Sequence, residues 1–286
     1  MIDYILEPFS YNFMFKAILV SSLVGVICAC ISSFLIFKGW SLIGDALAHS
    51  IVPGVAIAHL ISLPFSVGAF ISGIFAAMSM TLINQFTKLR EDVVIGLIYT
   101  SYLALGLSIV SFSSIPINIE AIVLGNILGI SDIDILQIII ISIVLLLIIF
   151  VKWKDIRLVI FDESYAQSLG LNTFLLKILF ITLLSAATVA ALQTVGTCLV
   201  IALVITPGAT AYLLTDNFKK LILISISMGA SSSALGSYLS YFLDINPSGL
   251  IVCLQSLMFF SVLYLSPKYG IMRNMINKKI LINIIK

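Results

Sequence analysis

The chain has 286 residues, of which 61% are hydrophobic and only 10% are charged, and its mean hydropathy is +1.21. This composition excludes an ordinary water-soluble domain and is typical of a membrane protein that crosses the bilayer many times. We expect no nucleic-acid partner for such a chain.

Nine apolar segments follow one another along the chain, each near the length of about 20 residues that spans a bilayer. They cover residues 14–37, 41–61, 64–84, 93–113, 135–151, 174–192, 195–214, 221–243 and 249–266. Only a few residues around Gln193 separate the sixth segment from the seventh, so eight spans are an alternative to nine. We predict an all-α transmembrane bundle that forms one domain over residues 1–268, with residues 269–286 as a cytoplasmic tail of no assigned function.

The basic residues predict the orientation of this bundle in the membrane. If the N-terminus lies outside and nine helices alternate in direction, every lysine and arginine except Lys16 falls at a cytoplasmic end, as the positive-inside rule demands. The C-terminus then lies inside. The outer side carries acidic residues, which either favour arriving cations or are simply parts of solvated loops. These residues are Asp3, Glu7, Glu120, Asp132, Asp134 and Asp244.

The second segment contains unusual polar residues in the stretch GWSLIGDALAHSIVPGVAIAHL, residues 39–60. At 1.5 Å per residue from Lys38, Asp45 lies about 10 Å and His49 about 16 Å into a hydrocarbon layer about 30 Å thick. Because they are four residues apart, both side chains share one helix face. A carboxylate and an imidazole suit a divalent first-row metal such as manganese, iron or zinc, with water or a partner helix completing the shell. The alternative is a buried pair that orients helices.

Three further features of the apolar segments bear on transport. His59 is rotated away from the face of Asp45 and His49, and is either a ligand where the ion enters or an interfacial histidine. Two similar stretches, IVPGVAIA and VITPGATAY, each contain a proline followed by a glycine. Proline removes a backbone donor, so we expect two opened helices lining the pathway, at Pro53 and Gly54 and at Pro207 and Gly208.

Two other stretches predict contacts between elements. In SMGASSSALGSYLS, Gly229, Ser233 and Ser237 recur every four residues and form a smooth face for helix packing. The loop KWKDIRLVIFDESYAQSLGLN is amphipathic over residues 155–171 and too polar to span. Its pattern of Glu163, Ala166 and Gly170 favours a short helix along the membrane surface that ends at the glycine. Such a helix either docks on a soluble partner or rests on lipid headgroups.

The stretches GDALAHSIVPGVAIA, FDESYAQSLGLN and TVGTCLVIALVITPGATAYLL strongly resemble the permease subunit of ATP-binding-cassette (ABC) importers for manganese, iron and zinc. The resemblance covers residues 10–268 and is closest to the manganese and chelated-iron branch. It implies the type II importer fold, a bacterial inner membrane, a second permease subunit that is identical or paralogous, cytoplasmic ATPase subunits and an external metal-binding protein. It also implies a metal site at Asp45 and His49, and a coupling helix around Glu163, Ala166 and Gly170.

The resemblance therefore predicts a permease that imports Mn2+ or Fe2+ and has no permanently bound cofactor. The chain has no G-x-x-x-x-G-K-[ST] phosphate loop. We therefore expect that it is not an enzyme and that a separate subunit hydrolyses ATP. One alternative is a zinc importer of the same family. Another is a secondary transporter coupled to an ion through Asp45, which leaves the amphipathic loop unexplained. A metalloenzyme would need further ligands and a general base, and H-E-x-x-H is absent from the sequence.

Overall fold

The computed structural model describes residues 2–112, 125 and 127–266, and every regular element in these ranges is a helix. The all-α prediction is confirmed. The tail of residues 269–286, Glu120 and the side chain of Asp3 lie outside what the structure describes. The elements are α1 (Ile2–Ser10), α2 (Asn12–Lys38), α3 (Ser41–Ser50), α4 (Val52–Leu60), α5 (Phe65–Phe86), α6 (Glu91–Phe112), η1 (Ile127–Gly129), α8 (Asp132–Phe161), α9 (Glu163–Ser168), α10 (Thr173–Leu214), α11 (Phe218–Leu243) and α12 (Pro247–Leu265).

Eight helical segments of the described part are long and apolar enough to cross a membrane, with α3 and α4 together counted as one. They correspond to eight of the nine segments expected from the sequence. The ninth forms a shorter apolar helix, Leu199–Leu214. At 1.5 Å per residue this helix is about 24 Å long, less than the hydrocarbon thickness of about 30 Å. The described residues therefore form eight full spans and one shorter helix.

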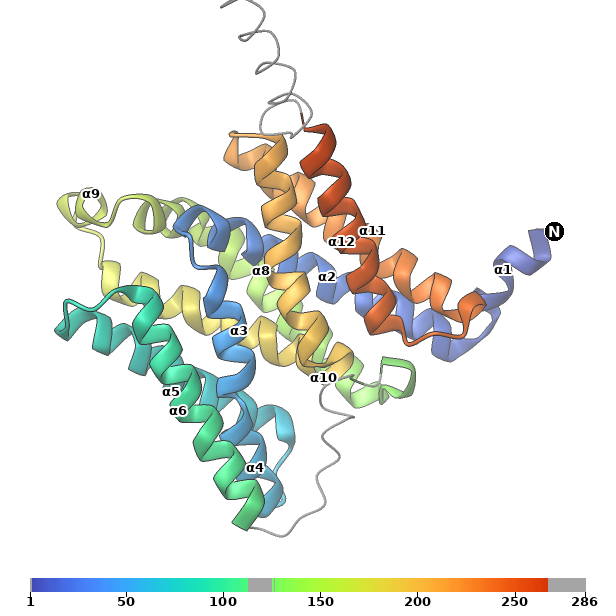
Figure 1. Ribbon diagram of the computed structural model, residues 1–286, viewed down its shortest axis with the longest axis horizontal. Helices are drawn as coiled ribbons and strands as arrows, with labels where there is room; N and C mark the ends of the chain where they lie inside the picture. Colours follow the sequence, from blue (N-terminus) through green and yellow to red (C-terminus); the bar gives the residue numbers. More distant parts are fainter. Residues whose placement is uncertain (1, 113–124, 126, 267–286) are drawn as a thin grey trace, which may run out of the picture.

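The shorter helix is the second arm of α10, which bends sharply at Gly196. The backbone there has φ 77° and ψ 168°, far from helical values, and Figure 1 shows two arms that meet at a bend. Phe180 on the first arm contacts the ring of Phe34, near the end of α2. On the second arm, Tyr212 contacts the ring of Phe37 in the same region. The two arms therefore run in opposite directions, as the interpretation with nine segments expects.

Polar side chains explain where several helices begin. The side chains of Ser131, Asp162, Asn172, Asn217 and Asn246 each accept a hydrogen bond from a backbone N–H in the helix that follows. The first N–H groups of a helix have no partner within it, and such a cap contributes about 0.5–2 kcal/mol of stability. Except for Asp162, which caps α9, these residues lie two to four positions before an apolar segment, so they fix helix starts that hydropathy alone does not define.

The helices form two groups that α10 joins. In the first group, α2 packs against α10 and α11, and α12 packs against α10 and α11. In the second group, α3, α4, α5 and α6 pack on one another. The two arms of α10 reach α3 and α5 as well as α2. Figure 1 shows the second group as a separate lobe, in blue to green, beside α10. In this arrangement α3 lies beside α10, where the two groups of helices meet.

Small residues bring α2 and α11 close together in the first group. A β-carbon on Gly25 would lie 2.5 Å from the carbonyl oxygen of Gly229, so no larger residue fits there without a shift. Ser225 donates a hydrogen bond of 2.7 Å to the backbone carbonyl of Ala29. Gly229, Ser233 and Ser237 are all buried. The packing face that their spacing predicts is confirmed.

Helix α8 is longer than the apolar segment from which it was predicted. The segment covers residues 135–151, whereas α8 has 30 residues and continues to Phe161. Its length is about 45 Å at 1.5 Å per residue, so it extends beyond a hydrocarbon layer of about 30 Å. Lysine and arginine are good helix formers, and outside the hydrocarbon they do not end a helix. Residues 155–161, expected in the amphipathic surface helix, therefore belong to α8.

Candidate functional site

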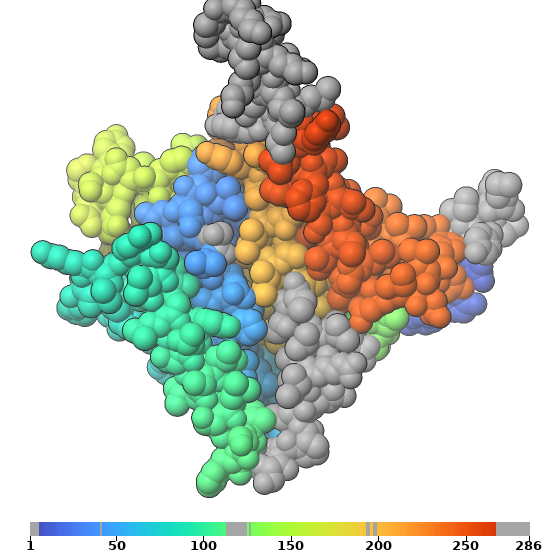
Figure 2. Space-filling view, in the orientation of Figure 1, coloured from blue at the N-terminus to red at the C-terminus, as the bar shows by residue number. Residues whose placement is uncertain are grey.

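Helix α3 carries the two polar residues that the sequence singles out. It packs against α6 and α10, and a β-carbon on Gly44 would lie 2.8 Å from Val204 Cγ1, so a glycine is needed for this close approach. Another face of α3 is less covered: Leu42 is exposed, and the side chains of Asp45 and His49 are 37% and 30% exposed. Figure 2 shows a strip of α3, in blue, uncovered between the teal lobe and the amber arm of α10.

Asp45 and His49 lie together on this face, as their spacing predicts. Nε2 of His49 is 3.4 Å from Oδ1 of Asp45. The His49 ring also contacts the ring of Tyr99 on α6, edge to face, with ring centroids 5.2 Å apart. Such contacts between aromatic rings have a preferred geometry, so Tyr99 restricts how the imidazole turns. Sequence reasoning missed Tyr99, because nothing in an apolar segment distinguishes one tyrosine that faces a distant histidine.

The pair offers an ion two protein ligands, one oxygen and one nitrogen. Among the residues that the structure describes, no three or more histidine, cysteine, aspartate or glutamate side chains are grouped so as to hold a metal. A structural metal site uses about four protein ligands. Two ligands on a partly exposed helix face suit an ion that binds briefly and leaves, with other ligands supplied from outside this chain.

His59 lies apart from this pair. It is exposed at the end of α4, and its ring stacks on that of Phe65 with centroids 5.4 Å apart. Ten residues of helix separate it from His49, which is about 15 Å at 1.5 Å per residue. The structure therefore does not bring His59 to the Asp45–His49 pair, and a role where the ion enters stays a prediction.

Pro53 and Gly54 follow the point at which α3 gives way to α4, and both are buried. A β-carbon on Gly54 would lie 2.0 Å from the carbonyl oxygen of Gly68 on α5. Gly106 of α6 also lies close, since its β-carbon would be 2.9 Å from the backbone nitrogen of Pro53. The structure gives this dipeptide a packing role inside the second group of helices, and a place on the pathway stays a prediction.

Pro207 and Gly208 lie within the second arm of α10, and the prediction that the helix opens there is wrong. The one non-helical backbone conformation within α10 is at Gly196. The hydroxyl of Ser32, on α2, donates to the carbonyl of Ile205 at 3.1 Å and accepts from the backbone N–H of Gly208 at 3.0 Å. A side chain of the neighbouring helix thus satisfies backbone groups next to the proline, which lets the helix continue.

The short helix predicted within the polar loop, over residues 155–171, is α9, which is limited to Glu163–Ser168. Its end is built on Gly170, which has φ 78°. The N–H of Gly170 donates to the carbonyl of Gln167 at 2.9 Å, and the N–H of Leu171 donates to that of Ala166 at 3.1 Å. This is the Schellman arrangement, in which a left-handed glycine ends a helix. The prediction that a glycine ends this helix is confirmed.

Side chains fasten α9 to the start of α10. Nζ of Lys177 lies 2.6 Å from Oε2 of Glu163, and the amide of Gln167 donates to the hydroxyl of Thr173 at 3.2 Å. Ala166 is completely buried. Tyr165 on α9 and Leu169 directly after it remain more than half exposed. The contacts hold α9 and the first arm of α10 together and leave apolar side chains uncovered.

A bundle with this many membrane-crossing helices and an ionisable pair part-way along one of them is typical of a multi-pass membrane transport protein. Residues 10–266 match the family model described as the ABC 3 transport family, and the chain belongs to this family. It is therefore the transport subunit of an ABC transporter, which implies ATPase and substrate-binding partners. The family and the fold that the sequence motifs indicate are confirmed, and the ion-coupled secondary transporter is set aside.

Known relatives align over nearly the whole chain. It is 54% identical over 272 residues to the chelated iron transport system membrane protein YfeC of Yersinia pestis, covering 95% of this chain and 92% of that protein. It is 40% identical over 271 residues to the manganese transport system membrane protein MntB of Synechocystis sp., covering 94% and 88%. A solved structure of PsaBC from Streptococcus pneumoniae in complex with Fab has a TM-score of 0.85 and 31% identity, covering 96% of this chain and all of that one.

Proposed function

We propose that this chain forms the membrane pathway of an importer that moves Mn2+ or Fe2+ into the bacterial cytoplasm. The observation that carries the proposal is the Asp45–His49 pair, which has an oxygen and a nitrogen ligand on one partly exposed face of a membrane-crossing helix. Membership in the ABC 3 transport family and the names of relatives, for chelated iron and for manganese, support this class of cargo.

The pair acts by replacing part of the hydration shell of the ion midway across the membrane. A carboxylate near the centre of a spanning helix costs about 2.5–3.5 kcal/mol on insertion scales, and a divalent cation beside Asp45 offsets that cost. Water or the second permease subunit, identical or paralogous, completes the shell. Mn2+, Fe2+ and Zn2+ all accept this ligand set, so zinc remains the alternative cargo.

The proposed partners occupy opposite ends of the bundle. ATPase subunits dock at α9, where Tyr165 and Leu169 are exposed beside a helix that Glu163 and Lys177 fasten to α10. The external metal-binding protein delivers the ion at the other end. The N-terminus then lies outside the bacterial inner membrane, in the orientation that the basic residues favour.

Uptake by the complete complex in lipid vesicles tests this proposal. The permease, copurified with its ATPase subunits, is reconstituted, and the entry of Mn2+, Fe2+ and Zn2+ is measured with and without ATP. We expect uptake of Mn2+ or Fe2+ that requires ATP and external binding protein. Metal entry that is independent of ATP would contradict it, and a clear preference for Zn2+ would favour the zinc alternative. Asp155→Asn, which removes a carboxylate paired with Lys152 at the end of α8, is the control for a change of charge outside the pathway.

A further inference from the structure

Trp40 occupies a tight corner between α2 and α3. Gly39 has φ 75°, its N–H donates to the carbonyl of Ile36 at 3.2 Å, and the N–H of Trp40 donates to that of Leu35 at 3.0 Å. This turn ends α2 and places Trp40 directly before the first residue of α3. Trp40 is only 7% exposed. The indole is therefore fixed at the start of the helix that carries Asp45 and His49.

On one side, Trp40 holds α3 to α6. Its indole N–H donates a hydrogen bond to the carboxylate of Glu91, in the first turn of α6. A charged acceptor makes this hydrogen bond stronger than one between neutral groups. About two helical turns further along α6 lies Tyr99, whose ring contacts His49. The bond thus joins the start of α3, which carries the candidate metal site, to α6, which carries Tyr99.

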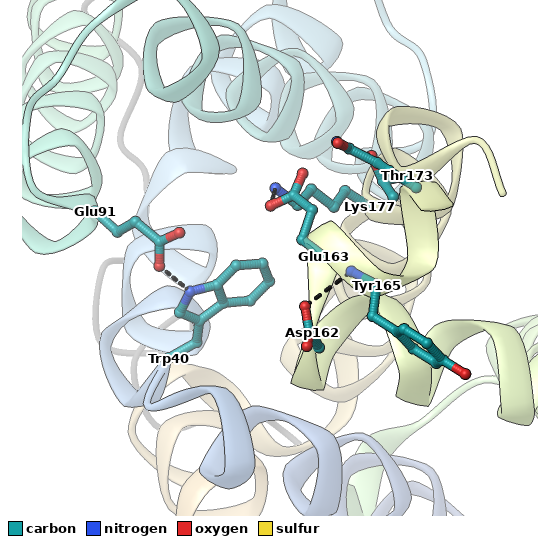
Figure 3. Close-up of polar contacts among 8 residues, drawn as sticks. Trp40, Glu91, Asp162, Glu163, Tyr165, Thr173 and Lys177 are labelled. Carbon is teal, nitrogen blue, oxygen red and sulfur yellow. Dashed lines mark hydrogen bonds and ion pairs between the residues drawn. The ribbon is translucent and has the colours of Figure 1, made fainter. Parts of the chain in front are cut away.

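On its other side, Trp40 reaches the first arm of α10. Its ring lies 6.5 Å from that of Phe180, centroid to centroid, and the two residues line one small pocket together with Lys177. Lys177, one turn before Phe180, makes the ion pair with Glu163 at the start of α9. Figure 3 shows the indole between Glu91 on one side and the Glu163–Lys177 pair on the other.

We propose that Trp40 transmits movement of α9 to the helices that hold the metal site. The route runs from Glu163 through Lys177 to the first arm of α10, from there to the Trp40 ring, and through its N–H to α6. A shift of α9 on ATP binding moves this arm and changes how α3 and α6 meet around the site. Trp40 is a positioning residue, because it acts through other residues and does not touch the ion. This inference rests on the proposed function and deepens it.

The test measures how much metal enters per ATP hydrolysed by the reconstituted complex. Trp40→Phe keeps an aromatic ring and removes the N–H, whereas Glu91→Ala removes the acceptor. For both variants we expect uptake of Mn2+ per ATP to fall about tenfold, within the usual range of coupling between sites. ATP hydrolysis and Mn2+ binding to the purified permease should stay near their wild-type levels. The double variant should be no worse than the more affected single variant, because both changes remove one bond.

Two variants serve as controls. Glu91→Gln keeps an acceptor oxygen for the indole N–H and should retain most coupling. Asp92→Asn changes a neighbouring carboxylate whose partner is the exposed guanidinium of Arg90, 3.1 Å away, and should behave as wild type. Unchanged uptake per ATP in Trp40→Phe and Glu91→Ala would overturn the proposal. So would a lowered thermal unfolding midpoint with hydrolysis and uptake reduced together, because that pattern indicates a structural role. If the wild-type complex takes up no metal with ATP, the proposed function itself fails.

Discussion

Two sets of polar residues lie within the membrane-crossing bundle: the serines between α2 and α11, and the Asp45–His49 pair on α3. Of these two sets, only the serines are fully buried. Ser225 and Ser237 are fully buried, and their hydroxyls donate to the carbonyl of Ala29 and to the hydroxyl of Ser21. Asp45 and His49 are about one-third exposed, and both are ionisable.

The difference separates two reasons for a polar group to lie within the membrane. A serine hydroxyl bonds to a neighbouring backbone at little cost and lets helices approach, so it contributes to the fold. An aspartate on an open face costs more than it returns in packing, so its retention indicates a function. Changes at α3 should therefore reduce uptake and leave stability intact, whereas changes between α2 and α11 should reduce stability first.

The largest expected effect is at the metal pair. Asp45→Asn keeps the size of the side chain and removes the charge that offsets a divalent cation, so nearly all uptake should disappear. His49→Ala removes the nitrogen ligand and should do the same or change the metal preference. The double variant should be little worse than either single one, because two ligands of one ion act as a unit. Metal uptake in vesicles and thermal unfolding in detergent are measured together. A well-folded double variant that still imports Mn2+ would rule out the ligand role.

A substitution at Gly170 should give the next largest effect. It tests whether only changes in α3 abolish uptake. A β-carbon there meets no atom within 4 Å, so Gly170→Leu acts through the left-handed backbone, at a cost of roughly 1–2 kcal/mol. The end of α9 should rearrange, so ATPase assembly or ATP-driven uptake is lost while the permease stays folded and binds metal. Gly249→Leu, in helix α12 with equally open space, is the matched control. Undiminished uptake in Gly170→Leu would contradict the proposal that ATPase subunits dock at α9.

A smaller effect, this time on stability, is expected between α2 and α11. Gly25→Ala places a β-carbon 2.5 Å from the carbonyl oxygen of Gly229, which should lower the free energy of unfolding by about 1–3 kcal/mol. Gly96→Ala, which meets no atom within 4 Å, should be neutral or slightly stabilising. Thermal unfolding in detergent compares the two alanine variants. Equal unfolding midpoints would show that the close approach of α2 and α11 is not needed.

The smallest effect is expected for a single serine of this interface. Ser225→Ala removes one hydrogen bond to the Ala29 carbonyl and should destabilise the protein by about 0.6 kcal/mol, the average for such bonds in membrane proteins. Ser227→Ala, an exposed position on the same helix, should have no measurable effect. Uptake per folded molecule should be unchanged in both variants. A loss of uptake without a loss of stability in Ser225→Ala would contradict the distinction between a region that stabilises the fold and a region that serves uptake.

The sequence predicts most helices of the fold because their length and hydropathy are properties of single segments. Seven of the nine expected segments end within three residues of the helices observed, and the shorter second arm of α10 lies within the segment of residues 195–214. The exception at the end of α8 arises because hydropathy marks the membrane boundary, whereas the helix ends ten residues later at Phe161. The continuity of α10 at Pro207 depends on Ser32, 175 residues earlier, which no local pattern reveals.

The features of the candidate site likewise fall into those that local sequence predicts and those that depend on packing between helices. The spacing of Asp45 and His49 predicts a shared face, because four residues are about one helical turn. Tyr99 and the Trp40–Glu91 bond could not be predicted, since each depends on how α6 packs against α3. The glycine that ends α9 could be predicted because the turn is local, whereas the Lys177–Glu163 ion pair joins two elements across that turn.

The bend of α10 has a consequence for which substitutions the chain tolerates. Gly196 has φ 77° and ψ 168°, a combination open essentially to glycine alone, so every other amino acid is strained there. Gly125 has φ 70°, and a β-carbon on it would lie 2.4 Å from the backbone nitrogen of Gly196. In a library with all twenty amino acids at each position, these two glycines should be among the least replaceable in the protein. Selection would then preserve them as strictly as ligands, although neither has a side chain with which to hold an ion.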